Sequence, residues 1–258
     1  MNSNLQEMWD VISPFYDDEN NFSDDADMFL KMAGKLRGEV LELACGTGRI
    51  LIPFAQAGYT ITGLDFSEKM LDRGREKIVR LPKNVQKRIS LVHADMTDFQ
   101  LSKKFAFIFI GFNSLLTVID FRKQEKVIRL ITEHLKPGGR VGVSVINPDL
   151  GVFSEKVPYV KHAGTWIDSA TGHTVDCFEF DYFDLANQFI YGTKLYDEID
   201  DQSIVRRTRQ VYEMRYFFSY ELQLLLEKQG LKVLNIYGDY SMKPFTEKNP
   251  YIIFECRK

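Results

Sequence analysis

Apolar runs of strand length alternate with helical patterns between residues 39 and 147, and this alternation restricts the fold more than any other feature. The run 105–110 is apolar at every position, as expected of a central strand that is buried on both faces. The other runs of strand length are 40–44, 59–64, 88–93, 140–146, 231–237 and 251–256. Strands that alternate with helices form a parallel sheet with helices on both faces. We therefore expect an α/β fold with a doubly wound, mostly parallel, seven-stranded sheet.

The alternation stops at residue 147, and the next segment, 148–218, shows almost no helical period. A structureless loop of that length is uncommon inside a compact domain. Within the segment, 174–184, 188–199 and 204–217 have the pattern of long strands, so we expect an inserted, small antiparallel β-sheet. The expected organisation is an N-terminal helical segment or lid (1–38), an α/β core (39–147 and 219–258) and the antiparallel insert (148–218). The acidic stretch 17–27 is interpreted as a solvated connecting segment.

A glycine turn follows the first strand, at the edge where open α/β sheets bind ligands. Gly46 and Gly48 let a ligand approach the backbone closely, because neither carries a Cβ atom. Asp65 ends the next strand, where its carboxylate can accept hydrogen bonds from both hydroxyl groups of a ribose. The dinucleotide-binding fingerprint needs a third glycine at position 51, and this chain has Leu51. A nucleoside without a pyrophosphate therefore fits this turn better than NAD.

These motifs resemble those of the class I S-adenosylmethionine-dependent methyltransferases. Residues 40–48 are similar to their first motif, and 63–71 to their acidic strand end and the following helix. Residues 93–96 resemble their adenine-contacting turn, and 135–139 the turn before their fifth strand. The resemblance implies a Rossmann-like fold, S-adenosyl-L-methionine as cofactor and methyl transfer as the reaction.

The N-terminal Phe15-Tyr16-Asp17 and the insert are similar to the small-molecule branch of this family. Within that branch, the chain resembles amino-sugar N,N-dimethyltransferases and, through residues 111–114, glycine N-methyltransferase. The resemblance therefore implies a small-molecule methyl acceptor. Because the insert leaves the core at the end of the fifth strand, on the edge where open α/β sheets bind ligands, we expect the insert and the N-terminal segment to enclose this acceptor.

The resemblance also implies roles at the methionine and ribose ends of the cofactor. Gly46 and Gly48 would pass beneath the methionine part, with Ala44 lining the same floor. Glu42 would help to organise the ammonium side, and Asp65 would hold the ribose.

At the adenine end, the resemblance places Phe66 and Met70 on the faces of the base. Asp95 would accept a hydrogen bond from the amino group, beside Met96. Asp98 is a second loop acid at this place, so the sequence leaves the choice between the two acids open. Flexible methionine side chains pack well on rings, which agrees with this arrangement.

Two residues are predicted to act in catalysis. Tyr16 would fold over the sulfonium of the cofactor, since an aromatic face attracts a cation. The alternative interpretation of Tyr16 is an aromatic anchor for the N-terminal segment. Asn113, at the end of the fourth strand and next to a predicted cofactor contact, Phe112, would orient the acceptor. No motif supplies a strong base, which favours an amine over a hydroxyl group as the acceptor.

Charge and cysteine content narrow the choice of partners. A net charge of −3 gives no basic field for a phosphate backbone, so nucleic acid is not expected. No apolar stretch is long enough to cross a membrane, and the N-terminal residues contain no apolar signal region. The three cysteines, Cys45, Cys177 and Cys256, form no Cys-x-x-Cys pair, so neither a disulfide nor a metal site is expected. We expect a cytoplasmic protein, with homodimer formation left open.

The sequence thus predicts an S-adenosylmethionine-dependent methyltransferase that acts on the nitrogen, or the oxygen, of a small molecule by in-line displacement. Two alternatives stay open at this point. One is an NAD-dependent oxidoreductase, which Leu51 disfavours. The other is a non-catalytic protein that binds a nucleoside cofactor, because residues that bind acceptors follow no general motif.

Overall fold

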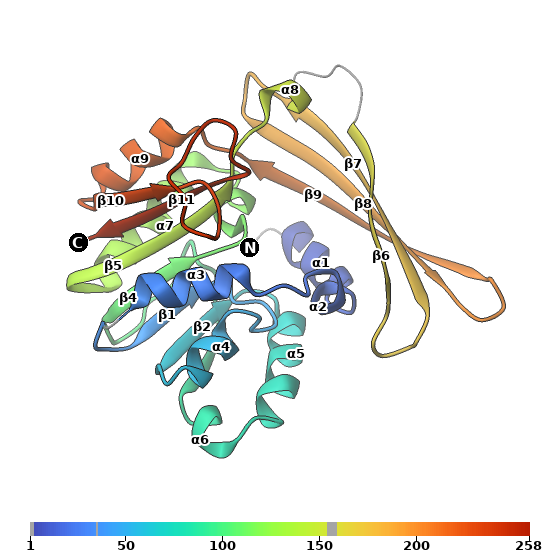
Figure 1. Cartoon of the computed structure of the whole chain (residues 1–258), viewed down its shortest axis with the longest axis horizontal. Coiled ribbons are helices and arrows are strands. Elements are labelled where there is room, and N and C mark those ends of the chain that lie inside the picture. Colours follow the sequence, from blue (N-terminus) through green and yellow to red (C-terminus); the bar gives the residue numbers. More distant parts are fainter. Residues whose placement is uncertain (1–2, 35, 154–158) are drawn as a thin grey trace. The chain divides into compact units, whose positions relative to one another are not determined.

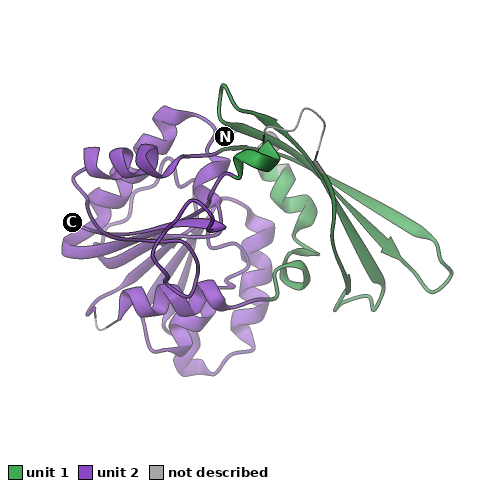
Figure 2. Cartoon of the chain, turned by 45° about the horizontal axis from the view of Figure 1, so that its top comes forward, with its two compact units in different colours: residues 1–21, 149–215 green, residues 22–148, 216–258 purple. Residues whose placement is uncertain are grey.

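The structure of the chain is a computed structural model that describes residues 3–34, 36–153 and 159–258 (Figure 1). Residues 1–2 and 35 of the expected N-terminal segment, and 154–158 of the expected insert, lie outside the described residues. The chain forms two compact units (Figure 2). Unit 1 contains residues 1–21 and 149–215, and unit 2 contains residues 22–148 and 216–258.

Unit 2 contains a seven-stranded sheet in the order β10-β11-β5-β4-β1-β2-β3. Its strands are β1 (Val40–Leu43), β2 (Ile61–Asp65), β3 (Ile89–His93), β4 (Phe105–Ile110), β5 (Leu135–Ile146), β10 (Lys232–Tyr237) and β11 (Tyr251–Arg257). β11 runs antiparallel to both of its neighbours, whereas β1 to β5 pair in parallel. The structure therefore confirms the expected doubly wound, mostly parallel sheet.

Helices connect these strands and cover both faces of the sheet. They are α3 (Asp24–Ala33), α4 (Leu51–Gln56), α5 (Glu68–Val79), α6 (Lys83–Gln86), α7 (Phe121–His134), α9 (Ser219–Lys228) and the short 3₁₀ helix η1 (Ser114–Thr117). Ser67 begins α5, because its side chain accepts a hydrogen bond from the Met70 amide at 3.2 Å. α4 connects β1 to β2 and α5 connects β2 to β3, so both move the chain toward the β3 edge of the sheet. α7 connects β4 to β5 and moves the chain toward the β10 edge. Right-handed crossovers therefore place α7 on the opposite face from α4 and α5.

Aromatic rings fill much of the core between the sheet of unit 2 and its helices. Phe109 of β4 packs against Phe29 of α3, with ring centroids 4.7 Å apart, and against Phe54 of α4 at 5.1 Å. All three side chains are fully buried. Each buried phenylalanine contributes a few kcal/mol of hydrophobic stabilisation, so this cluster fixes α3 and α4 on the sheet.

The fifth strand begins earlier than the sequence predicts, at Leu135 instead of Arg140. Phe105 pairs with Leu135, and Phe107 pairs with Arg140, so the register shifts between them. The expected Pro-Gly-Gly turn is therefore a bulge inside the strand, in which Gly138 adopts a φ of +74°. The pattern of apolar residues could not reveal this bulge, because the bulge depends on how β5 pairs with β4, which is distant in the sequence.

Unit 1 contains a four-stranded antiparallel sheet in the order β6-β7-β8-β9. Its strands are β6 (Tyr159–Ile167), β7 (Thr174–Asp184), β8 (Phe189–Ile199) and β9 (Val205–Arg215), and its helices are α1 (Ser3–Ile12), α2 (Tyr16–Glu19) and α8 (Leu150–Phe153). β7, β8 and β9 agree with the three predicted strands. β6 was not predicted, and its pairing with β7 is interrupted by a register shift between His162 and Gly164.

The N-terminal helices α1 and α2 belong to unit 1, whereas α3 belongs to unit 2. Phe15, which precedes α2, stacks on Tyr196 of β8 with ring centroids 5.0 Å apart and an interplanar angle of 7°. The backbone amide of Ser169 also donates a hydrogen bond to Asp18 at 2.9 Å. The start of the chain and the antiparallel sheet therefore pack as one unit. Among the described residues, no helix is long and apolar enough to cross a membrane.

Candidate functional site

The glycine turn of unit 2 follows β1 at the carboxyl end of the parallel strands. β1 lies between β2 and β4, so the chain winds away from it in both directions, and ligands bind at such switch points. Ala44, Gly46 and Gly48 have φ angles of 55°, 52° and 81°. Glycine adopts this left-handed backbone readily, whereas alanine rarely does. The positive φ of Ala44 therefore indicates that surrounding contacts hold the turn in this conformation.

The Asp65 carboxylate fixes this turn from the end of β2. The Gly46 amide donates a hydrogen bond to Asp65 Oδ2 at 2.8 Å, and the Ser67 amide donates to Oδ1 at 2.9 Å. Burial raises the pKa of Asp65, although these hydrogen bonds oppose the change. A carboxylate has about four acceptor sites, so Asp65 can still accept a hydrogen bond from a ligand at the turn.

Gly63 of β2 has a packing role that the sequence analysis missed. A Cβ atom at Gly63 would lie 2.3 Å from Leu51 Cδ1 and 2.7 Å from Cys45 Sγ. Leu51 therefore occupies the space above β2, where it replaces the third glycine of the dinucleotide fingerprint. Cys45 is buried as a small apolar group, and burial raises the pKa of its thiol well above the usual value.

Glu42 of β1 is buried beside the turn, and its Oε2 has no hydrogen-bond partner among the described residues. Burial raises the pKa of Glu42 well above its usual value, and the positive charge of Arg49 acts in the opposite direction. A buried acceptor without a partner is costly. A ligand that brings a polar hydrogen to this place would satisfy the atom, so Glu42 fits the predicted ammonium side of a cofactor.

A buried ion pair next to the turn was not predicted. Arg49 donates to both carboxylate oxygens of Asp25 at 2.7 and 2.6 Å, and Asp25 is fully buried. The guanidinium carbon lies 4.3 Å from the ring centroid of Phe22 and 5.0 Å from that of Phe112. The interpretation of the acidic stretch as a solvated segment is therefore wrong for Asp25. No local sequence pattern marks this pair, because its partners are far apart in the chain.

The predicted adenine side is formed by the ends of β2 and β3. His93 Nε2 lies 2.9 Å from the carbonyl oxygen of Phe66, which joins the two strand ends. Phe66 is partly exposed, whereas Met70 and Met96 are buried. Asp95 Oδ1 accepts a hydrogen bond from the Thr97 amide, and Asp95 Oδ2 has no hydrogen-bond partner among the described residues.

The second loop acid, Asp98, is occupied elsewhere. It is exposed and forms an ion pair of 2.7 Å with Lys126 of α7. Asp95 Oδ1 instead accepts a hydrogen bond from the Thr97 amide at 2.7 Å, in a turn next to the end of β3. This difference favours Asp95 over Asp98 for the contact that the sequence left open.

The two predicted catalytic residues lie in different units. Asn113 follows β4 in unit 2, where Phe112 and Asn113 have φ angles of 49° and 65°. Asn113 Oδ1 accepts a hydrogen bond from the Ile146 amide at 2.7 Å, so the side chain also joins β4 to β5. Tyr16 begins α2 in unit 1, with its ring edge-on to Trp9 at 6.3 Å. The catalytic roles of Asn113 and Tyr16 stay predictions.

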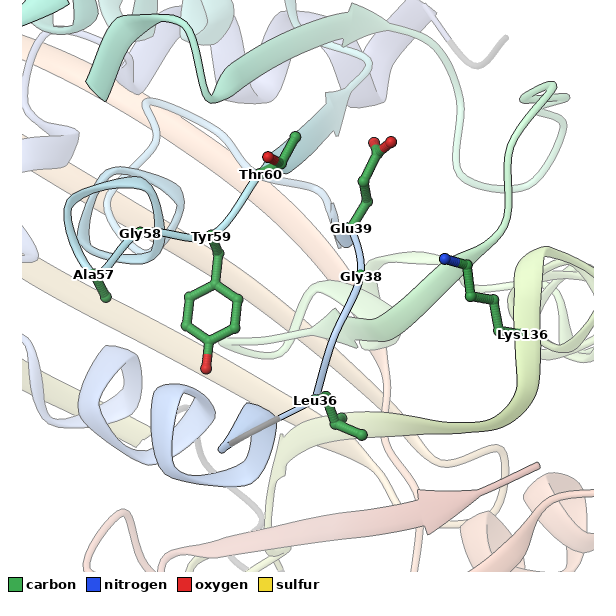
Figure 3. Close-up of a pocket in the computed structure, with 8 residues that line it drawn as sticks. All are labelled: Leu36, Gly38, Glu39, Ala57, Gly58, Tyr59, Thr60 and Lys136. Carbon is green, nitrogen blue, oxygen red and sulfur yellow. The ribbon is translucent and has the colours of Figure 1, made fainter. Parts of the chain in front are cut away.

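A hollow of about 510 Å³ lies at the opposite edge of the sheet, at the amino ends of β1 and β2 (Figure 3). It is lined by Leu36, Gly38, Glu39, Ala57, Gly58, Tyr59, Thr60 and Lys136. None of the predicted site residues lines it, and the length of the strands separates it from the glycine turn. Within the described ranges, no group of three or more His, Cys, Asp or Glu side chains is arranged to hold a metal ion.

Residues 40–139 match the family model described as a methyltransferase domain. A demethylmenaquinone methyltransferase of Lactobacillus johnsonii is 33% identical over 150 residues, which cover 54% of this chain and 59% of that protein. A dTDP-3-amino-3,4,6-trideoxy-alpha-D-glucopyranose N,N-dimethyltransferase of Streptomyces venezuelae is 35% identical over 104 residues, which cover 40% of each protein. The chain thus spans about half the length of the curated relatives it matches.

Solved structures share the fold over most of the chain. The CcbJ methyltransferase from Streptomyces caelestis has a TM-score of 0.76 and 24% identity, covering 91% of this chain and 89% of that chain. An S-adenosylmethionine-dependent methyltransferase from Clostridium acetobutylicum has a TM-score of 0.76 and 18% identity, covering 92% and 91%. At these identities the likeness shows the fold. Residues 40–139, which contain the glycine turn, therefore form a domain similar to the methyltransferase domain, in a chain that shares the fold of S-adenosylmethionine-dependent methyltransferases.

Proposed function

We propose that this protein transfers the methyl group of S-adenosylmethionine to a small-molecule acceptor, with nitrogen favoured over oxygen as the methylated atom. The observation that carries the proposal is the glycine turn at the switch point of the sheet, held by the hydrogen bond between Gly46 and Asp65. This arrangement offers a backbone floor and a carboxylate to a nucleoside, and Leu51 takes the space that a pyrophosphate-binding turn leaves free.

The buried groups around the turn fit the cofactor. Glu42 Oε2, which has no partner among the described residues, would accept a hydrogen bond from the ammonium group of the methionine part. Asp65 would use its remaining lone pairs on the two ribose hydroxyl groups. When bound, S-adenosylmethionine supplies a methyl group that its sulfonium already activates. The protein therefore needs chiefly to align the reactants and to exclude water, which can lower a barrier by about 7–11 kcal/mol.

The ends of β2 and β3 would hold the adenine. Phe66 and Met70 would contact its faces, and Asp95 would accept a hydrogen bond from its amino group next to Met96. The support is that Asp95 has an oxygen available, whereas Asp98 is paired with Lys126.

The acceptor is proposed to be a small molecule that unit 1 helps to enclose. Asn113 would orient the acceptor through its amide nitrogen, because its Oδ1 is already used by Ile146. Tyr16 would contribute its ring near the sulfonium. The N,N-dimethyltransferase among the relatives supports nitrogen as the accepting atom, as does the lack of a strong base motif. The demethylmenaquinone methyltransferases among the relatives also act on a small molecule.

Calorimetry with the purified full chain tests the cofactor assignment. We expect S-adenosylmethionine and S-adenosylhomocysteine to bind, and NAD not to bind. Micromolar binding of NAD with no binding of S-adenosylmethionine would instead support the oxidoreductase alternative. A screen of amine and hydroxyl metabolites for release of S-adenosylhomocysteine tests the reaction. Cofactor binding without turnover of any acceptor class would support the non-catalytic alternative.

We further propose that the protein works in the cytoplasm and has no nucleic-acid partner. The net charge of −3 and the three free, buried cysteines support this placement. A homodimer stays a prediction, which light scattering coupled to gel filtration tests.

A further inference from the structure

Three titratable side chains meet on one face of the antiparallel sheet of unit 1. Glu179 and Asp181 are two residues apart on β7 and therefore share a face, and Tyr212 comes from β9. Gly192 of β8 pairs with both Asp181 and Tyr212. A Cβ atom at Gly192 would lie 1.9 Å from Tyr212 Cζ, so the missing side chain lets the tyrosine ring extend across β8 toward the two acids.

The Tyr212 hydroxyl lies between two carboxyl oxygens. Its oxygen is 2.6 Å from Glu179 Oε1 and 2.5 Å from Asp181 Oδ1, and both are lengths of strong O–H···O hydrogen bonds. A phenol has one hydrogen, so it can donate to one carboxyl group and must accept from the other. An ionised carboxylate has no hydrogen to donate. Both short contacts become full hydrogen bonds when one of the two acids is protonated, whereas two ionised carboxylates would have to share the single phenol hydrogen.

The lysines on this face decide which acid keeps the hydrogen. Lys161 Nζ of β6 lies 2.5 Å from Glu179 Oε2, and Lys194 Nζ of β8 lies 4.0 Å from Oε1. Asp181 forms no ion pair within the described part of the chain. Burial raises the pKa of Glu179, but the lysines and Tyr212 together bring that pKa below its usual value. Burial raises the pKa of Asp181, and the hydrogen bond from Tyr212 only partly offsets it.

The lysines and glutamates near Asp181 on this face pair with one another without involving Asp181. Lys194 also pairs with Glu19 of α2 at 2.6 Å, so two lysines face two glutamates. Among the described side chains, the other titratable groups on this face are Cys177, Tyr196, Glu198 and Arg206. Glu198 forms an ion pair of 2.7 Å with His173, toward the far end of the strands from Asp181. Burial raises the pKa of Cys177 to about 12 and that of Tyr196 above its usual value, so both are neutral. An ionised Asp181 would add a negative charge with no counter-ion, which is costly at a buried position.

We propose that Asp181, Tyr212 and Glu179 form a proton-binding site, in which Asp181 carries the hydrogen. Asp181 Oδ1–H donates to the Tyr212 oxygen, and the Tyr212 hydroxyl donates to Glu179. The site holds its proton at a pH at which an ordinary aspartate has lost it. Loss of the proton places a bare carboxylate oxygen against the hydroxyl oxygen and weakens the link between β7 and β9. The site is independent of the proposed methyl transfer.

Carbon-13 NMR of the side-chain carboxyl groups in the full chain tests the proposal directly. We expect the Asp181 resonance, assigned through the backbone, to titrate with a midpoint above the ordinary value of about 3.9. In Tyr212→Phe the midpoint should move, because the bridging oxygen is gone. A wild-type Asp181 resonance that titrates at or below about 3.9 overturns the proposal, and this measurement needs no variant to fold.

Thermal unfolding of the full chain at several pH values is the second test. A raised pKa in the folded state stabilises the protein fully below the ordinary pKa, and this contribution is lost as pH rises through the raised value. In Asp181→Asn an amide N–H replaces the carboxyl hydrogen at every pH. We expect the unfolding midpoint of the wild type to fall relative to that of Asp181→Asn as the pH rises above about 4.

Asp197→Asn is the matched control on the same sheet, because Arg207 lowers the pKa of Asp197. The unfolding midpoint of Asp197→Asn should fall as the pH rises, as that of the wild type does. If Asp181→Asn shifts the midpoint equally at both ends of the pH range, the proposal fails. It also fails if Glu179→Gln, and not Asp181→Asn, removes the pH dependence.

Discussion

The Gly46 amide donates a hydrogen bond of 2.8 Å to the Asp65 carboxylate, and this contact joins the turn after β1 to the end of β2. The Ser67 amide holds the other oxygen of the same carboxylate, so Asp65 fixes the turn and also begins the loop into α5. One side chain thus supports the shape of the proposed cofactor site, and we also propose it as the ribose contact. Substitutions at Asp65 report on both functions.

We expect Asp65→Ala to weaken the binding of S-adenosylmethionine by about 1–3 kcal/mol, the usual cost of leaving buried hydrogen-bond partners unpaired. This corresponds to roughly a 5- to 150-fold increase in Kd, measured by calorimetry. Asp98→Ala is the matched control, because Asp98 is an exposed acid that pairs with Lys126. Unchanged affinity in a folded Asp65→Ala protein would contradict the ribose assignment.

Gly63→Ala should destabilise unit 2 by about 1–3 kcal/mol, as overpacking of a core does. The new Cβ atom would meet Leu51 Cδ1 at 2.3 Å and Cys45 Sγ at 2.7 Å, and both side chains are buried. Denaturant unfolding followed by circular dichroism measures the change. Gly164→Ala provides the comparison, because its nearest neighbour is an atom of Trp166 at 3.8 Å, and its midpoint should stay close to that of the wild type.

Asp25→Ala should lower the free energy of unfolding by about 3–5 kcal/mol, because it leaves the charge of Arg49 without its buried partner. The same denaturant measurement applies. Removal of the exposed ion pair between Lys126 and Asp98 by Lys126→Ala should leave the midpoint nearly unchanged. Equal effects of the two variants would mean that the Arg49–Asp25 pair contributes no more than a surface contact.

All three thiols should resist Ellman's reagent in the folded protein. Cys45, Cys177 and Cys256 are buried, and burial raises the pKa of both Cys177 and Cys256 to about 12. The thiolate is the reactive form, so at about pH 8 the thiols should react only after unfolding in guanidinium chloride. A rapidly reacting thiol in the native protein would show that one of these sites opens.

Local patterns in the sequence predicted the strands, the glycine turn and Asp65. Each of these features has a signature within a short segment: an apolar run, a Gly-x-Gly turn or an acid at a strand end. They also fixed the seven-stranded sheet, because alternation and right-handed crossovers leave few arrangements. β6 was missed, since its pairing shifts register at Gly164.

The contacts that were not predicted join residues far apart in the chain. Asp25 looked like one of several solvated acids, and only the fold brings it to Arg49. Asp181 and Tyr212 meet because Gly192 between them has no side chain. No periodicity marks such pairs, because burial and charge compensation depend on which strands become neighbours.

The last prediction is that unit 2 binds the cofactor and that unit 1 is needed for binding the acceptor. The residues proposed to bind the cofactor lie within 42–112 of unit 2, whereas Tyr16, which is proposed to act in catalysis, lies in unit 1. Since α1 and α2 pack with the antiparallel sheet, removal of the insert alone would leave Phe15 without Tyr196. A variant that starts at Phe22 and replaces 149–215 by a short Gly/Ser linker therefore removes unit 1 as a whole.

If this variant folds, as circular dichroism and a cooperative unfolding transition would show, we expect it to bind S-adenosylmethionine within about tenfold of the full chain. It should transfer no methyl group to the acceptor that the screen identifies, because the residues proposed to enclose the acceptor are gone. Asp65→Ala in the same background should weaken the remaining cofactor binding by the same factor of roughly 5 to 150, which would show that this binding uses the proposed site. Methyl transfer at the rate of the full chain would place the whole active site in unit 2 and contradict the division.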